Sequence, residues 1–122
     1  EGTDLMPPTN QRGFYPVFSA TAGTVEHMGW LQKGGWRIGI RSEQGGYFYY
    51  AHLSEYAPGM EEGKTVEAGE MLGYMGDSGY GEEGTVGQFA VHLHFGIYIQ
   101  TADGREVSVD PYWILKGLEG EP

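Results

Sequence analysis

Glycines separate the sequence into short runs of aromatic and aliphatic residues. Glycine makes up 22 of the 122 residues, about 18%, against about 7% in average usage. A glycine-rich chain that stays disordered is poor in aromatic residues, whereas this one has 9 Tyr, 5 Phe and 3 Trp. Apolar runs bounded by turn residues are typical of many strands joined by many turns. The pattern predicts an all-β fold, and the length fits one domain.

Period-two alternation of apolar and polar residues locates the expected strands. The shorter runs lie at residues 15–18, 23–26, 36–41 and 47–53. The clearest run is 91–99, where every second side chain points to the same face of a strand. We expect this face to belong to the core; its residues are Val91, Leu93, Phe95, Ile97 and Ile99.

Two segments fall outside the expected strands. Residues 77–88 are rich in glycine and contain two adjacent acids, which predicts a surface loop. Residues 110–117 predict one or two helical turns, with Pro111 at the first helical position and Gly117 at the end. Residues 117–122 are expected to fray.

The net charge of −10 at pH 7 narrows the function classes. A negative field repels phosphate backbones and anionic lipid headgroups, so we expect no nucleic-acid partner. The sequence has no run of about 18 apolar residues, so we expect no membrane insertion within this chain. The absence of cysteine excludes disulfides, thiolate metal sites and cysteine nucleophiles.

Three of the four histidines fall on expected strands. His92 and His94 lie on the non-core face of the run 91–99, about 7 Å apart, where they can share a ligand. By the same alternation, His52 shares a face with Phe48 and Tyr50, and periodicity alone does not bring that face to the other two histidines. The fourth, His27, is expected to be a surface residue in a turn.

Asp4 lies in a polar N-terminal segment, where an aspartate is ordinarily solvated. Beside imidazole nitrogens, however, a carboxylate oxygen would complete part of a zinc site, because Zn²⁺ accepts nitrogen and oxygen donors in tetrahedral geometry. No H-E-x-x-H sequence is present, so a metallopeptidase scheme with a glutamate base on a helix is excluded.

Taken in order, these segments resemble the lysostaphin and LytM-type zinc metalloendopeptidases. Residues 50–53 (YAHL) resemble the family's Y-x-H-L segment, 92–95 (HLHF) its H-L-H-F strand, and 2–5 (GTDL) the end of its H-x-G-x-D-[LI] opening. Further similar stretches lie at 15–25, 66–70 and 72–79. The resemblance runs from residue 1 to about residue 115.

The resemblance implies a fold, an activity and a site. The fold would be mainly antiparallel β-sheets with long loops, of the duplicated-hybrid-motif or barrel-sandwich kind. It would form one domain over residues 1–122, with a catalytic core at about 1–116. The activity would be zinc-dependent hydrolysis of peptide bonds in peptidoglycan stems or cross-bridges. The expected location is the cell envelope or the extracellular space, with any targeting or anchoring segment upstream.

Individual positions match the family's functional residues. Asp4 and His94 would be metal ligands, and His52 and His92 the non-ligating catalytic pair that handles protons and stabilises the tetrahedral intermediate. A zinc ion with three protein ligands keeps its fourth position for water and lowers the pKa of that water. Tyr49, Tyr50 and Tyr98 are further candidates for hydrogen bonds to the substrate, although aromatic strand residues more often pack.

Two departures from the family pattern affect these expectations. The family's first metal ligand is a histidine four residues before the aspartate, which would fall immediately before Glu1. On this ground the chain as given is expected to be inactive by itself, and a catalytically degenerate binding or regulatory module is the alternative function. The segment 80–91 is also longer and more acidic than in the family, so we expect it to border the cleft and alter which wall peptide fits.

Overall fold

The structure is a computed structural model that describes residues 2–110. This part of the chain forms nine strands and no helix. The strands are β1 (Thr3–Leu5), β2 (Pro16–Phe18), β3 (Gly23–Leu31), β4 (Gly35–Arg41), β5 (Tyr47–Tyr56), β6 (Thr65–Val66), β7 (Met71–Met75), β8 (Leu93–Gln100) and β9 (Glu106–Val109). The expectation of an all-β fold with antiparallel pairing is confirmed.

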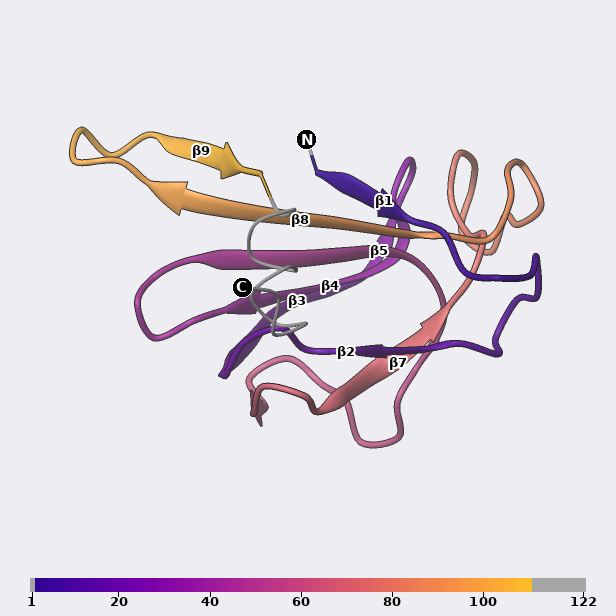
Figure 1. Ribbon diagram of the computed structural model, residues 1–122, viewed down its shortest axis with the longest axis horizontal. Helices are drawn as coiled ribbons and strands as arrows, with labels where there is room; N and C mark the ends of the chain where they lie inside the picture. The colour runs from indigo at the N-terminus through magenta and orange to yellow at the C-terminus, as the bar shows by residue number, and fades with distance from the viewer. Residues whose placement is uncertain (1, 111–122) are drawn as a thin grey trace.

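The strands form one antiparallel sheet with a branch. The main path runs β1-β8-β5-β4-β3-β6, and β7 branches from β5 to pair with β2. In Figure 1 the long strands β8, β5, β4 and β3 lie side by side, and β2 and β7 form a second layer below them.

Strand β5 changes partner along its length. Its first part, up to Ala51, pairs with β8, and its last part, from Leu53, pairs with β7. His52 is the residue between these two parts. The sheet therefore branches at a residue that the sequence marked as a site candidate.

The outer edge of β8 carries two short strands, one after the other (Figure 1). β1 pairs with it from Leu93 to Phe95, and β9 pairs with it from Ile97 to Gln100. The register of β1 places Asp4 opposite His94, which in turn lies opposite Ala51 of β5. Because laterally paired residues point to the same face of a sheet, Asp4, His94 and Ala51 form one row.

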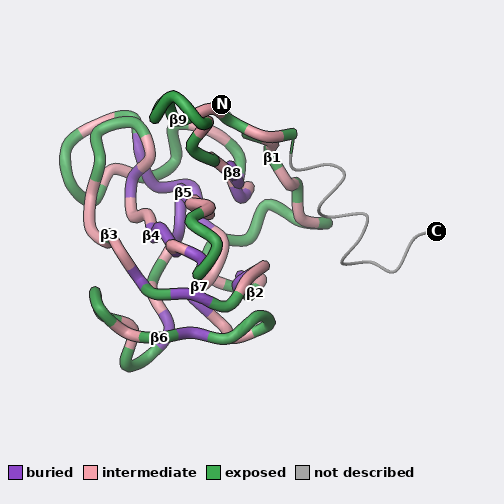
Figure 2. Tube along the Cα trace, turned by 90° about the vertical axis from the view of Figure 1, so that its left-hand side faces the viewer, coloured by how far each residue is buried: buried purple, intermediate pink, exposed green. Residues whose placement is uncertain are grey.

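The core lies between the long strands and the layer of β2 and β7, and Figure 2 shows exposed positions mainly along the turns. Alternation in residues 91–99 is confirmed at Val91, Leu93, Phe95 and Ile97, all of which are buried. It is wrong at Ile99, which is 44% exposed. Among the described strands, β8 pairs only with the short β9 beyond Tyr98, so this side chain lies outside the core that covers the others.

The expected surface loop at 77–88 is wrong at its start. Asp77 and Ser78 are buried; the Asp77 carboxylate lies 2.7 Å from Nε of Arg12, and Ser78 bridges to Val86. The helical turns expected at 110–117 lie, apart from residue 110, outside the described residues. Within residues 2–110 no helix is long and apolar enough to span a membrane.

Candidate active site

Asp4 and His94 meet across the β1–β8 pair. Nδ1 of His94 lies 2.8 Å from Oδ1 of Asp4, a hydrogen-bond distance. This hydrogen bond, with the positive potential of nearby histidines, holds the pKa of Asp4 below its usual value, against the opposing effect of partial burial. The carboxylate is therefore ionised and available as a ligand or acceptor.

His92 approaches the same carboxylate from the residue before β8. Its Nε2 lies 3.8 Å from Oδ1 of Asp4. Its Nδ1 lies 2.9 Å from the carbonyl oxygen of Ala90. A carbonyl can only accept, so Nδ1 carries the proton and Nε2 faces the aspartate. The backbone is fixed by the amide of His92, which donates to Gly76 at 3.2 Å.

His52 reaches the site because β5 contains a bulge. Ile38 pairs with Tyr50 and Trp36 with Leu53, so Ala51 and His52 together oppose the single residue between Trp36 and Ile38 on β4. His52 itself has a φ of 65°, in the left-handed region that non-glycine residues rarely adopt. The expectation that His52 shares a face with Phe48 and Tyr50 is wrong, because the extra residue reverses the alternation.

The imidazole of His52 is held in one orientation. Its Nδ1 donates to the carbonyl oxygen of Ser78 at 2.8 Å, and its backbone amide donates to Gly34 at 2.7 Å. Burial lowers the pKa of His52, which favours the neutral ring. With the proton on Nδ1, the lone pair lies on Nε2. The ring centroid lies 4.8 Å from that of His92 and 6.1 Å from that of His94.

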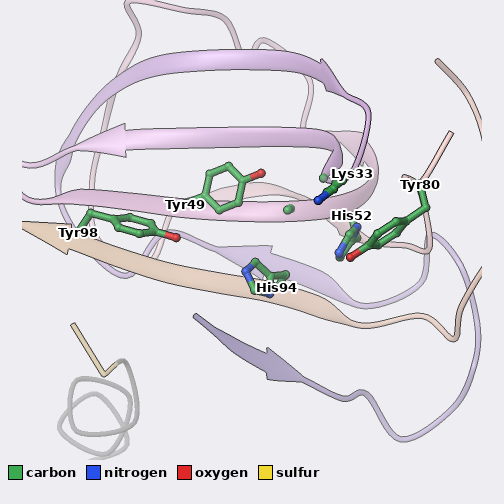
Figure 3. Close-up of a pocket in the computed structure, with 8 residues that line it drawn as sticks. Lys33, Tyr49, His52, Tyr80, His94 and Tyr98 are labelled. Carbon is green, nitrogen blue, oxygen red and sulfur yellow. The ribbon is translucent and has the colours of Figure 1, made fainter. Parts of the chain in front are cut away.

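Two adjoining cavities of about 430 and 480 Å³ open over these histidines. Both are lined by His52, Tyr80 and His94, so together they form one groove, which we call the histidine groove. Asp4 and His92 line one end. Lys33, Tyr49 and Tyr98 line the other, and Figure 3 shows their side chains around that end.

The three tyrosines predicted to contact substrate differ in position. Tyr49 and Tyr98 line the histidine groove. Tyr50 does not: it is 1% exposed, packs against Phe95, and its hydroxyl accepts a hydrogen bond from the Ala20 amide at 2.9 Å. A side chain buried in this way cannot reach a substrate, so the structure removes Tyr50 from the site.

Three further groove residues did not figure among the predicted site residues. Tyr80 and Phe89 come from the acidic segment 80–91, which borders the groove as expected. Their only sequence signal was their place in that segment. Lys33 lies in the β3–β4 turn, and no local pattern marked it.

His27 is exposed as expected, but it lies in β3 rather than in a turn, with Nδ1 3.0 Å from the Tyr47 hydroxyl.

The chemical types of the donor atoms in the groove suit a zinc ion. Asp4 and His94 offer a carboxylate oxygen and an imidazole nitrogen, which are zinc-binding groups. In residues 2–110, however, no group of three or more His, Cys, Asp or Glu side chains is arranged to hold a metal ion. The described part of the chain therefore supplies two donors that meet, with two further imidazoles beside them.

The sequence matches the profile of peptidase family M23 over residues 1–111. It is 46% identical over 120 residues to an L-Ala–D-Glu endopeptidase of Bacillus subtilis, an alignment that covers 98% of this chain and 35% of that protein. It is 34% identical over 103 residues to lysostaphin of Staphylococcus simulans, covering 83% of this chain and 19% of that one. The chain thus spans about a third or less of each of these relatives.

Solved structures share the fold. A crystal structure from Ruminococcus gnavus, provisionally described as a LytM glycyl-glycine endopeptidase, superposes with a TM-score of 0.92 at 58% identity, covering 98% of this chain and 47% of that one. The catalytic domain of lysostaphin from S. simulans gives a TM-score of 0.70 at 30% identity, covering 94% and 77% of the two chains.

Proposed function

This chain belongs to peptidase family M23, and from that membership we propose that it is the catalytic part of a zinc-dependent endopeptidase that cuts peptide bonds in bacterial peptidoglycan. The observation that carries the proposal is the meeting of Asp4 with His94 in an open groove that His52 and His92 also line. Zinc-dependent hydrolysis needs metal ligands, a proton acceptor and a proton donor, and this groove offers candidates for each.

Asp4 and His94 would hold the zinc ion. When bound, zinc supplies Lewis acidity that polarises the scissile carbonyl and lowers the pKa of water. The hydrogen bond to His94 and the neighbouring imidazoles keep the pKa of Asp4 low, so its oxygens need no deprotonation to act as ligands.

His52 is suited to accept a proton. Its Nδ1–H is committed to Ser78, and burial favours the neutral ring, which leaves the lone pair of Nε2 for a proton. The bulge and the hydrogen bond to Ser78 together fix the ring, so its orientation does not have to be found during the reaction.

His92 is suited to donate. Its Nδ1 is held by the carbonyl of Ala90, so Nε2 faces the groove, 3.8 Å from Oδ1 of Asp4. A proton on Nε2 can be donated to the oxygen of the substrate carbonyl as negative charge develops there. His52 and His92 would thus act on the two sides of one reacting bond.

The relatives suggest which bond is cut. The B. subtilis relative is named for the L-Ala–D-Glu bond and matches nearly all of this chain, whereas lysostaphin matches less of it at lower identity. We therefore propose a stem-peptide L-Ala–D-Glu bond as the first candidate. A glycyl-glycine bond is the second, because the R. gnavus protein that is 58% identical is described as a glycyl-glycine endopeptidase. Such a substrate places the enzyme in the cell envelope or outside the cell. A single domain over residues 1–122, with a core at 1–116, remains a prediction.

The test is mass spectrometry of muropeptides after incubation of purified cell wall with the zinc-loaded protein. New amino termini at a stem or cross-bridge bond, absent after chelation of zinc and absent with His52→Ala, support the proposal. Unchanged muropeptides from a protein shown by elemental analysis to contain zinc contradict it.

One observation favours the alternative of a non-catalytic binding or regulatory module: the described residues bring together two zinc-type donors rather than three. Such a module has no chemical need for His52 and His92 in the groove. The same experiment separates the two functions, because the module would bind wall peptides without cutting them.

A further inference from the structure

Lys33 is held at the edge of the histidine groove by its neighbours. The carbonyl of Gly34 accepts the amide hydrogen of His52 at 2.7 Å, and the carbonyl of Gln32 accepts that of Gly81 at 3.1 Å. The backbone on both sides of Lys33 is therefore tied to groove-lining segments. The backbone of Lys33 is therefore fixed in place, and the residue that follows it is hydrogen-bonded to β5 at His52.

Within residues 2–110 the ammonium group of Lys33 takes part in none of the ion pairs. The other basic side chains of these residues are engaged by the protein: ion pairs hold Arg12, Arg41, Lys64 and Arg105, and Arg37 donates to the carbonyl of Met28. With acids outnumbering bases 17 to 7, a lysine left without a carboxylate in a groove is available for a ligand.

The surroundings of Lys33 suit a carboxylate. No Asp or Glu is among the described residues that line this end of the groove. Tyr49 lies beside Gly34, the residue after the lysine: a Cβ added to Gly34 would lie 2.5 Å from the Tyr49 hydroxyl oxygen. Burial raises the pKa of Tyr49, so this hydroxyl keeps its proton and can donate. Lys33 and Tyr49 line the same cavity (Figure 3), and an ammonium group and a hydroxyl donor that share a cavity can together bind an anion.

The cavity places this anion next to the reacting bond. Lys33, His52 and His94 line the same space of about 430 Å³. An extended peptide advances about 3.3 Å per residue, so a substrate residue close to the scissile bond can place a carboxylate in this space. Resting on the proposed endopeptidase function, we propose that Lys33 and Tyr49 form a subsite for a free carboxylate on that residue, which makes an acidic stem peptide the substrate class.

The test compares two synthetic stem peptides that contain the L-Ala–D-Glu bond and differ only in whether the α-carboxyl group of the glutamate is free or amidated. We expect zinc-loaded protein to cleave the acid with a kcat/KM about tenfold above that for the amide, which corresponds to about 1.4 kcal/mol. Lys33→Gln should reduce the ratio to about one, chiefly by loss of activity on the acid, and Lys33→Arg should keep most of it.

Lys64→Gln is the matched control, because Lys64 is a surface lysine paired with Glu70 and does not line the groove. It should keep the wild-type ratio. The carboxylate subsite is wrong if wild-type protein cleaves both peptides equally, or if Lys33→Gln keeps the preference; in both cases the endopeptidase function stands.

Calorimetric titration of zinc-free protein with the same two peptides separates the two proposals. The subsite is supported if the protein binds the acid more tightly than the amide and if Lys33→Gln abolishes this difference. This holds even if neither peptide is cleaved, in which case only the endopeptidase function fails. Binding of neither peptide, or equal binding of both, contradicts the subsite.

Discussion

His52 donates its Nδ1–H to the backbone carbonyl of Ser78 across 2.8 Å, and Ser78 is in turn fixed by its own hydroxyl. Oγ of Ser78 donates to the carbonyl of Leu53 at 2.7 Å and accepts the amide hydrogen of Trp36 at 3.1 Å. One buried serine thus connects β4 and β5 and orients the imidazole at the bulge.

Ser78→Ala should destabilise the protein. The substitution leaves the Trp36 amide without its acceptor at a site where Ser78 is fully buried. An unsatisfied buried group costs about 1–3 kcal/mol, and urea unfolding measures this loss. Ser108→Ala, at an exposed position of β9, should change stability by less than about 0.5 kcal/mol. Equal unfolding midpoints for the two variants would contradict the role given to Ser78.

Substitutions of His94 in β8 and of His92 just before it should have different effects on metal binding and catalysis. His94→Ala should weaken zinc binding at least about 10–100-fold and abolish cleavage with it, because it removes a proposed ligand. His92→Ala should keep zinc and lower the cleavage rate by roughly 10²–10⁴. Elemental analysis and a peptide assay measure both properties. His27→Ala, on the surface of β3, is the control and should keep both; identical behaviour of the two site variants refutes the division of roles.

The Glu26–Arg41 ion pair should make stability depend on acid pH. Hydrogen bonding to Arg41 lowers the pKa of Glu26 from 4.5, despite some desolvation. The pair therefore stabilises the fold fully above pH 4.5, and this contribution is lost as the pH falls through the lower pKa of the folded state. Glu26→Gln should cost about 0.2–1 kcal/mol at pH 7, since both side chains are a third exposed.

The difference between wild type and Glu26→Gln should disappear well below pH 4.5 in urea unfolding. Glu43 is an exposed acid in a turn, so Glu43→Gln is the control and should hardly change the free energy of unfolding at pH 7. A difference for Glu26→Gln that stays constant from pH 7 to strong acid would show that the charge of Glu26 is not its source.

Gly76→Ala should disturb both stability and the site. The added Cβ would lie 2.6 Å from the backbone nitrogen of Ser54, which cannot move without separating β5 from β7. Overpacking of this kind costs about 1–3 kcal/mol. Gly76 also accepts the amide hydrogen of His92, so a shift here displaces a proposed catalytic residue. Urea unfolding and the peptide assay measure the two effects.

Gly46→Ala is the control for crowding, because its new Cβ would approach no atom closer than 3.4 Å. It should leave stability and cleavage nearly unchanged. If Gly46→Ala and Gly76→Ala behave alike, the close approach to Ser54 has no energetic consequence.

Alternation predicted β8 well because that strand is regular: each second residue from Val91 to Ile97 is buried. The same rule failed for His52, since a bulge adds a residue that leaves no trace in hydrophobic periodicity. Tyr50 was a candidate substrate contact only as an aromatic residue of an expected strand. Without the strand order, nothing in residues 47–53 says which face lies against the core.

The grouping of the site residues depended on contacts distant in sequence. Family resemblance suggested that Asp4, His52, His92 and His94 belong together, and the register of β1 and β5 on β8 brings them together. The burial of Asp77 and Ser78 depends on segments that only the folded chain brings near, and so does the lack of an ion pair at Lys33 among residues 2–110. Such properties are not encoded in local spacing.

The contact between Asp4 and His94 joins positions 90 residues apart. During synthesis the aspartate leaves the ribosome long before the strand that must receive it. A nascent chain, or any product that stops short of β8, therefore carries the carboxylate without its imidazole. Any activity of this groove can therefore begin only after translation has passed β8.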